Sequence, residues 1–442
     1  MAEPQRTDLS VQAESALLIT VLLPGSTADP MDPVGELRKL VRAAGAEVVD
    51  EMLIKRRRVH PGLYVGTGKA EEIADRAELN AADTIIFDND LTPGQIRDLE
   101  EILGRKVLDR SELILDIFAS HARTAEARLQ VELAQLEYTY PRLRHMWSHL
   151  ERIAGGATTA AAAVGGIGTR GPGEQQIEID RRLVQRRVSR LKRRLADIDR
   201  RKVRQIRSRE DLLNICLVGY TNAGKSTLMN ALTGADVLVA DQLFATLDTR
   251  TRRWDLGEGQ TALLSDTVGF VRDLPHHLVA SFRATLEEAI HADLLLHVAD
   301  ASHERAERQI QSVYDVLAEL GCEESQQMLL LNKTDRIADP AVRTVLAQRY
   351  PEALFVSAVT GEGLDDLRTA IARRAGGTPV RVTLHADCRN GRLMQYIAQY
   401  ARVESESFTD ATAHIEAVMP TGKLDELRAF GADVEVETAS AV

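Results

Sequence analysis

The segment GYTNAGKS at residues 219–226 constrains the fold of this chain more than any other feature. It has the spacing of a phosphate-binding loop, it follows the apolar run LLNICLV (212–218), and it precedes the helix-like run STLMNAL (226–232). A phosphate loop requires a strand before it and a helix after it. The segment therefore predicts a parallel α/β domain that binds a polyphosphate at the carboxyl end of a strand.

Four residues of this loop have predicted roles. Gly219 and Gly224 let the backbone curl so that successive N–H groups face the phosphates. Lys225 neutralises the β and γ phosphates, and Ser226 offers its hydroxyl to Mg²⁺. The alternative, a glycine turn that happens to precede a lysine, is disfavoured by the flanking strand and helix. The nucleotide-binding residues predicted here are Gly219, Tyr220, Thr221, Asn222, Ala223, Gly224, Lys225, Ser226 and Thr227.

Three further motifs follow later apolar runs. In DTVG (266–269), Asp266 can hold the Mg²⁺ shell and the Gly269 amide can meet the γ-phosphate. In NKTD (332–335), Asp335 can accept hydrogen bonds from N1–H and the exocyclic amine of guanine, which selects GTP over ATP. In SAV (357–359), the amide of the alanine can meet the guanine carbonyl. These motifs add Asp266, Thr267, Val268, Gly269, Asn332, Lys333, Thr334, Asp335, Ser357, Ala358 and Val359.

The order of apolar runs predicts a multidomain α/β chain. Residues 1–120 alternate short apolar runs with helix-like stretches, which predicts a small α/β domain with a largely parallel sheet. Residues 212–376 repeat this alternation around the motifs and predict a doubly wound sheet. Residues 377–442 give strand, helix, two strands, helix and strand, the βαββαβ order of a ferredoxin-like α+β domain.

Between these domains, residues 121–211 carry two heptad seams. Apolar or aromatic residues step by four and three from Leu129 to Leu150, and again from Val184 to Ile198. The Gly/Ala-rich stretch 155–173 lies between the seams. Two seamed helices joined by one long loop predict an antiparallel helical hairpin with the loop at its tip.

The second helix of this hairpin is strongly basic. From Arg181 to Arg209 there are 14 Lys or Arg and two acids, in a chain whose net charge is −11. Such a run is either a solvated helix face or a surface for a polyanion such as RNA. The predicted RNA-binding residues are Arg170, Arg181, Arg182, Arg186, Arg187, Arg190, Lys192, Arg193 and Arg194.

Composition excludes several other classes of protein. Hydrophobic residues make up 44% and charged residues 27%, which is typical of globular rather than disordered chains. No apolar run approaches the roughly 18 residues needed to span a bilayer, and the N-terminus lacks a signal-peptide pattern. Three separated cysteines form no CxxC pair and indicate neither a disulfide framework nor a zinc site. We therefore expect a cytoplasmic protein without a membrane span. Separately, we expect a monomer.

Together these motifs resemble the HflX family of ribosome-associated P-loop GTPases. FATLDTRTRR (244–253), DTVGF (266–270), GIGTRGPGE (166–174) and EIDRR (178–182) carry the resemblance with the hairpin. It implies a bacterial enzyme that hydrolyses GTP to GDP and phosphate with Mg²⁺ and binds the large ribosomal subunit and its RNA. Under stress it would separate ribosomal subunits or rescue ribosomes.

The resemblance also assigns residues. It places the switch I threonine at Thr246, where its hydroxyl would join that of Ser226 in the Mg²⁺ shell, with Asp266 in the outer shell. It makes Lys225, Thr246 and Gly269 catalytic. It adds Phe244, Ala245, Thr246, Leu247 and Asp248 to the nucleotide site.

One position departs from the usual GTPase pattern. Phe270 follows DTVG where many GTPases carry a water-orienting glutamine, and a phenyl ring cannot hydrogen-bond a water molecule. Intrinsic hydrolysis should therefore be slow, and a partner, another residue or a monovalent cation should raise it. Asn222 matches the position that helps ligate K⁺ in potassium-activated GTPases, and a turn-stabilising role is equally open.

Two other functions stay open at this point. The chain could be an RNA-binding module whose nucleotide is only a structural switch, which GTPase assays with and without large ribosomal subunits would test. It could instead be an ATP-driven RNA remodeller that uses the same phosphate loop, which competition between ATP and GTP would test.

Overall fold

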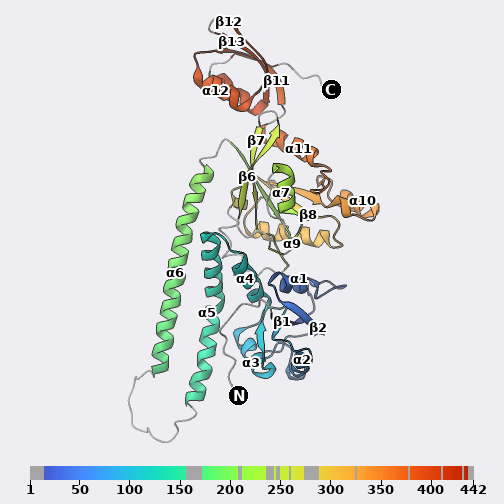
Figure 1. Ribbon diagram of the computed structural model, residues 1–442, viewed down its shortest axis with the longest axis vertical. Helices are drawn as coiled ribbons and strands as arrows, with labels where there is room; N and C mark the ends of the chain where they lie inside the picture. Colours follow the sequence, from blue (N-terminus) through green and yellow to red (C-terminus); the bar gives the residue numbers. More distant parts are fainter. Residues whose placement is uncertain are drawn as a thin grey trace. The chain divides into compact units, whose positions relative to one another are not determined.

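The structure is a computed structural model of the 442-residue chain (Figure 1). It describes residues 14–155, 172–207, 212–234, 243–244, 249–257, 260–272, 288–323, 326–376, 379–409, 412–430 and 433–436. The chain forms two compact units. The first unit comprises Met1–Gln205, Ala240–Asp248 and Val268–Leu286, and the second comprises Ile206–Val239, Thr249–Thr267 and Glu287–Val442.

The first unit begins with the predicted parallel α/β domain. Its sheet has the order β2-β1-β3-β4, and every paired strand is parallel. The strands are β1 (Ser15–Leu22), β2 (Glu47–Lys55), β3 (Thr84–Phe87) and β4 (Lys106–Leu108). The helices are α1 (Gly35–Ala43), α2 (Thr67–Leu79), α3 (Pro93–Leu103) and α4 (Arg110–His121). The three predicted strand runs are confirmed, whereas β2 and α4 were not predicted.

Helix boundaries in this domain follow from capping chemistry. The N-cap of α3 is Thr92, whose hydroxyl accepts from the Gln95 amide while the Gln95 side chain accepts from the Thr92 amide. Pro93 occupies the first turn, where its missing N–H costs nothing, and Gly104, with φ +61°, caps the end of α3. The N-cap of α4 is Asp109, whose carboxylate accepts from the Glu112 amide. The ends of α3 and the start of α4 are therefore fixed locally.

The predicted helical hairpin is present in the same unit. Helices α5 (Ala125–Gly155) and α6 (Pro172–Arg207) lie side by side (Figure 1). Residues of both seams form one small hydrophobic cluster, which confirms the heptad pattern. Its members are Leu129, Leu133, Leu136, Val188, Leu191 and Leu195.

The second unit holds a six-stranded sheet of order β10-β9-β8-β5-β7-β6. All neighbours are parallel except β6, which pairs antiparallel with β7 at the edge. The strands are β5 (Leu213–Gly219), β6 (Arg250–Gly257), β7 (Gln260–Asp266), β8 (Leu294–Asp300), β9 (Gln327–Asn332) and β10 (Leu354–Phe355). The helices are α7 (Lys225–Thr233), α9 (Ala306–Glu319), α10 (Pro340–Arg349) and α11 (Leu364–Gly376). The strand order reverses at β5, where doubly wound sheets bind ligands.

The C-terminal part of this unit has the predicted ferredoxin-like topology. Its antiparallel sheet has the order β12-β13-β11-β14. The elements in chain order are β11 (Pro379–Asp387), α12 (Gly391–Tyr400), β12 (Arg402–Thr409), β13 (Thr412–Pro420), α13 (Leu424–Ala429) and β14 (Asp433–Val436). The multidomain α/β fold class is thereby confirmed, while the exact boundaries at residues 120, 211 and 376 stay predictions. Across the described parts of the chain, no helix is long and apolar enough to cross a membrane.

Candidate nucleotide-binding site

The phosphate loop connects β5 to α7 at the point where the strand order reverses. Gly219 has φ +148°, and a Cβ there would lie 2.1 Å from the carbonyl oxygen of Val298. Gly224 has φ +94°, and a Cβ there would lie 2.4 Å from Nδ2 of Asn332. Neither position accepts a larger residue without displacing a neighbour. The two glycines therefore fix a tight loop whose amides precede the N-terminus of α7.

Lys225 is buried at the base of this loop. Its Nζ donates to the carbonyl oxygen of Gly219 at 3.1 Å and to that of Tyr220 at 3.0 Å. Burial lowers the pKa of Lys225 to about 8, while the nearby Asp266 carboxylate opposes this shift. A phosphate group would favour the charged ammonium in the same way as Asp266, and more strongly at hydrogen-bonding distance.

Ser226 and Asp266 supply oxygen atoms beside the loop. The Ser226 hydroxyl donates to Oδ2 of Asp266 at 2.6 Å, and Asp266 is fully buried at the end of β7. Thr267 donates its hydroxyl to the carbonyl oxygen of Leu217 at 2.7 Å, which holds the end of β7 against β5. A hydroxyl and a carboxylate are the ligands that Mg²⁺ prefers, so these residues fit that ion. When bound, Mg²⁺ would neutralise charge on the phosphates.

Asn332 links the phosphate loop to the SAV motif. This buried side chain donates through Nδ2 to the carbonyl oxygen of Ala223 at 2.9 Å and accepts through Oδ1 from the Ala358 amide at 3.1 Å. Lys333 donates to the carbonyl oxygen of Asn222 at 2.7 Å and to the Asp300 carboxylate at 2.7 Å. The NKTD motif is thus hydrogen-bonded directly to the phosphate loop, and the SAV motif is hydrogen-bonded to NKTD through Asn332.

Asp335 is oriented by a buried serine. The Ser357 hydroxyl donates to Oδ1 of Asp335 at 2.5 Å and accepts from the Thr360 amide at 3.1 Å. Thr334 donates to the Glu362 carboxylate at 2.8 Å, and this bond, with a second from Arg343, lowers the pKa of Glu362. With Oδ1 held by Ser357, the other carboxylate oxygen has a defined direction. That is the geometry needed to read adjacent donors on a base.

The second unit brings most of the predicted nucleotide residues together at the carboxyl edge of one sheet. They are Gly219 to Thr227, Asp266, Thr267, Asn332 to Asp335, and Ser357 to Val359. Phe244, Val268 and Gly269 belong to the first unit. Ala245, Thr246, Leu247 and Asp248 lie outside the described residues.

Two supporting residues were missed by the sequence reasoning. Asp300 ends β8 at this same edge, and its position after an apolar run was a usable signal. Glu362, by contrast, belongs to no motif and follows a turn. Its contacts with Thr334 and with the Ser357 amide identify it as part of the site.

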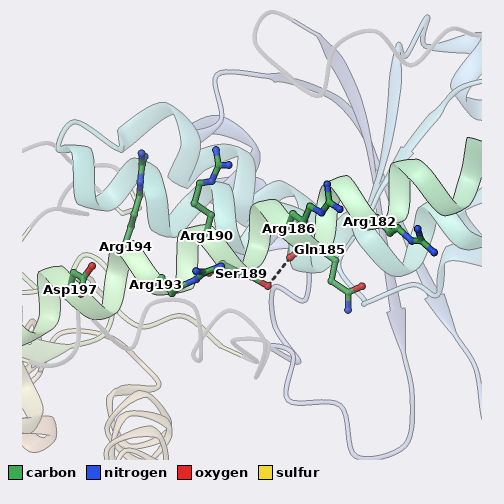
Figure 2. Close-up of a pocket in the computed structure, with 8 residues that line it drawn as sticks. All are labelled: Arg182, Gln185, Arg186, Ser189, Arg190, Arg193, Arg194 and Asp197. Atoms are coloured by element: carbon green, nitrogen blue, oxygen red, sulfur yellow. Dashed lines mark hydrogen bonds between the residues drawn. The ribbon is translucent and has the colours of Figure 1, made fainter.

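The basic residues of α6 divide between two roles. Arg187 pairs with Glu132 at 2.6 Å and Lys192 pairs with Glu137 at 2.7 Å, so both contact carboxylates of α5. Other residues of α6 line a hollow of about 650 Å³, and Figure 2 shows their side chains spaced along the helix. They are Arg182, Gln185, Arg186, Ser189, Arg190, Arg193, Arg194 and Asp197. Arg170 and the side chain of Arg181 lie outside the described residues.

The fold and the site together define a P-loop GTP-binding protein: a phosphate loop lies at the reversal point of a doubly wound sheet, and Ser357 holds the carboxylate of Asp335 at the same edge. Comparison with known proteins agrees with this class. Residues 32–119 match the family described as GTP-binding GTPase N-terminal, residues 121–209 its Middle Region, and residues 214–333 the family described as 50S ribosome-binding GTPase.

Whole-chain relatives give the family. GTPase HflX of Lacrimispora saccharolytica is 42% identical over 414 residues, covering 93% of this chain and 95% of the relative. GTPase HflX of Escherichia coli K12 is 42% identical over 394 residues, covering 88% and 90%. A GTP-binding protein of Sulfolobus solfataricus solved with GDP is 24% identical, with a TM-score of 0.43 over 82% of this chain and 98% of that one. The chain belongs to the HflX family of GTPases, which confirms the resemblance drawn from its motifs.

Proposed function

We propose that this GTPase binds the large ribosomal subunit through the α5–α6 hairpin and separates ribosomal subunits under stress, acting as a monomer in the cytoplasm. The arginine-lined face of α6 carries the proposal. Five arginines follow one another along this face, and a helix of that charge density gains free energy by displacing counterions from RNA phosphates. Arg187 and Lys192 instead form ion pairs with Glu132 and Glu137 of α5, which link the two helices of the hairpin.

We further propose the roles of the nucleotide-site residues. Lys225 stabilises charge on the β and γ phosphates, Ser226 and Thr246 ligate Mg²⁺, and Asp266 holds its outer shell. The Gly269 amide contacts the γ-phosphate and Asp335 reads guanine. For Asn222, ligation of K⁺ and stabilisation of the turn remain alternatives that a comparison of hydrolysis in potassium and sodium buffers separates.

The test is multiple-turnover GTP hydrolysis with and without purified large subunits. Because Phe270 cannot orient the attacking water, we expect slow hydrolysis by the protein alone and acceleration by large subunits. Light scattering of intact ribosomes reports subunit separation in the same samples, and Lys225→Ala is the inactive control. Fast turnover by the isolated protein in sodium buffer, or no acceleration by large subunits, would contradict the proposal.

A further inference from the structure

A buried ionic network lies at the carboxyl edge of the N-terminal sheet, where parallel sheets of this kind bind ligands. Asp88 follows β3 and Arg110 follows β4. Both residues contact Arg272 of the same chain, which lies three residues after Gly269 in the segment that follows DTVG.

The network joins two arginines and two carboxylates. Arg110 contacts Oδ1 of Asp88 at 2.5 Å and Oε1 of Glu36 at 2.7 Å, and Arg272 contacts Oδ2 of Asp88 at 2.7 Å. The side chains of Arg110 and Asp88 are only 3% and 4% exposed. Charges at such depth are tolerated when they are paired, and removing one partner is strongly destabilising.

The backbone of Arg272 is held as well. Its amide donates to Oε1 of Glu36 at 3.2 Å, and its carbonyl oxygen accepts from Nη2 of Arg110 at 3.0 Å. Both ends of this residue are therefore fixed by the N-terminal domain, through groups that come from α1 and the start of α4.

Apolar contacts also hold residues next to the two predicted catalytic positions Gly269 and Thr246. Val268 and Val271 are buried in the core that α1, α4 and α5 share. Phe244 enters the same core with φ +58° and packs edge-to-face on Phe118, with ring centroids 4.6 Å apart. A left-handed phenylalanine is strained and persists only where its surroundings hold it.

We propose that Arg272 is a positioning residue for GTP hydrolysis: its network with Asp88, Glu36 and Arg110 fixes segment 268–272 so that the N-terminal domain sets the hydrolysis rate. The inference rests on the role proposed above for the Gly269 amide. The side chain of Phe270 offers no hydrogen bond, so we expect segment 268–272 to contribute to hydrolysis through the backbone amide of Gly269. A backbone donor stabilises a transition state best when its position is already fixed.

The experiment measures single-turnover hydrolysis and GTP affinity of full-length variants. Arg272→Gln should lower the hydrolysis rate about tenfold, with GTP affinity within about twofold of wild type, because a pre-organising contact acts on the chemical step. The matched control is Arg38→Gln, which removes ion pairs with Glu51 and Asp32 in the same domain and should leave hydrolysis unchanged.

A double variant separates positioning from folding. Arg272→Gln leaves one uncompensated negative charge in the network, whereas Arg272→Gln with Asp88→Asn restores neutrality. The double variant should therefore regain thermal stability while its hydrolysis stays slow. Recovery of hydrolysis together with stability would show a purely structural role and overturn the proposal, as would wild-type or faster hydrolysis by Arg272→Gln.

Gly269→Pro distinguishes failure of this inference from failure of the function on which it rests, because proline lacks the backbone N–H, and Gly269→Ala, which keeps it, is the control. Loss of hydrolysis in Gly269→Pro but not in Gly269→Ala, with wild-type hydrolysis in Arg272→Gln, would remove only the positioning role. Normal hydrolysis in Gly269→Pro would instead remove the proposed role of the Gly269 amide.

Discussion

Replacing Asp335 by Asn should change which base the site binds, because the hydrogen bond from Ser357 determines how the new amide group is oriented. The Ser357 hydroxyl donates to Oδ1 of Asp335 at 2.5 Å. In the variant this hydroxyl would hold the amide oxygen and turn the amide nitrogen toward the base. An amide nitrogen only donates hydrogen bonds, so it opposes the exocyclic amine of guanine and suits the carbonyl oxygen that xanthine has at the same place.

The expected size of the effect follows from the hydrogen bonds lost. A hydrogen bond to a charged group contributes about 1.5–3 kcal/mol, and the carboxylate accepts two from guanine. The variant keeps one acceptor oxygen, the amide oxygen, but this oxygen also accepts from Ser357. We therefore expect a net loss of about 3 kcal/mol in the free energy of GTP binding. That loss weakens GTP binding roughly 150-fold.

A competition titration with a fluorescent guanine nucleotide measures the change. Wild type should prefer GTP over xanthosine triphosphate, and Asp335→Asn should reverse the preference. Asp365→Asn is the matched control, because that side chain is 94% exposed on α11 and should leave both affinities unchanged. If Asp335→Asn still prefers GTP, Asp335 does not read the base.

Three further predictions address the phosphates, the basic face and the hairpin tip. Lys225→Ala should abolish tight GTP binding. In the wild-type protein, burial lowers the pKa of Lys225 to about 8, so above pH 8 the free protein must take up a proton to bind GTP. Calorimetry in buffers of different ionisation enthalpy should therefore show weaker binding with proton uptake at about pH 9, and no proton uptake at about pH 7. Replacing Arg186, Arg190, Arg193 and Arg194, four exposed arginines of α6, with Gln should weaken cosedimentation with large subunits and flatten its salt dependence. The control, Arg187→Gln, removes one partner of an ion pair with Glu132 and should not have this effect. Shortening the stretch 155–173 should leave GTP affinity unchanged but reduce subunit-stimulated hydrolysis, and unchanged stimulation would refute a role for the tip.

The parts of the fold that the sequence predicts are those with strong local signals. β10 has only two residues, Leu354 and Phe355, yet the motif SAV after it marks its end. The hairpin was predictable because its seam residues repeat every three or four positions and then bury one another, as Leu133, Leu191 and Leu195 do. In both cases the signal and its structural consequence lie close together in the chain.

Strands β2 and β6 escaped prediction because charged residues interrupt them. In β2, Asp50 pairs with Arg76 of α2 and Glu51 pairs with Arg38 of α1, so the acids are compensated by helices that pack nearby. In β6, an antiparallel edge strand, only Trp254 and Leu256 are buried. An apolar run is expected of a strand covered on both faces and not of strands like these.

The parallel strands of two sheets in this chain follow the same rule, but different groups lie at their carboxyl edges. The carboxyl edge of the second unit's sheet presents Lys225 and Asp335 in the arrangement that suits a nucleotide, while that of the N-terminal sheet presents Asp88 and Arg110 to Arg272. The rule locates a binding edge from strand order alone, but what binds there depends on charges far apart in the sequence. In the sequence, nothing distinguishes Arg272 from a surface arginine, because its partner Asp88 is far away in the chain. Since the Arg272–Asp88 ion pair is largely buried, we expect its loss to lower the rate of GTP hydrolysis.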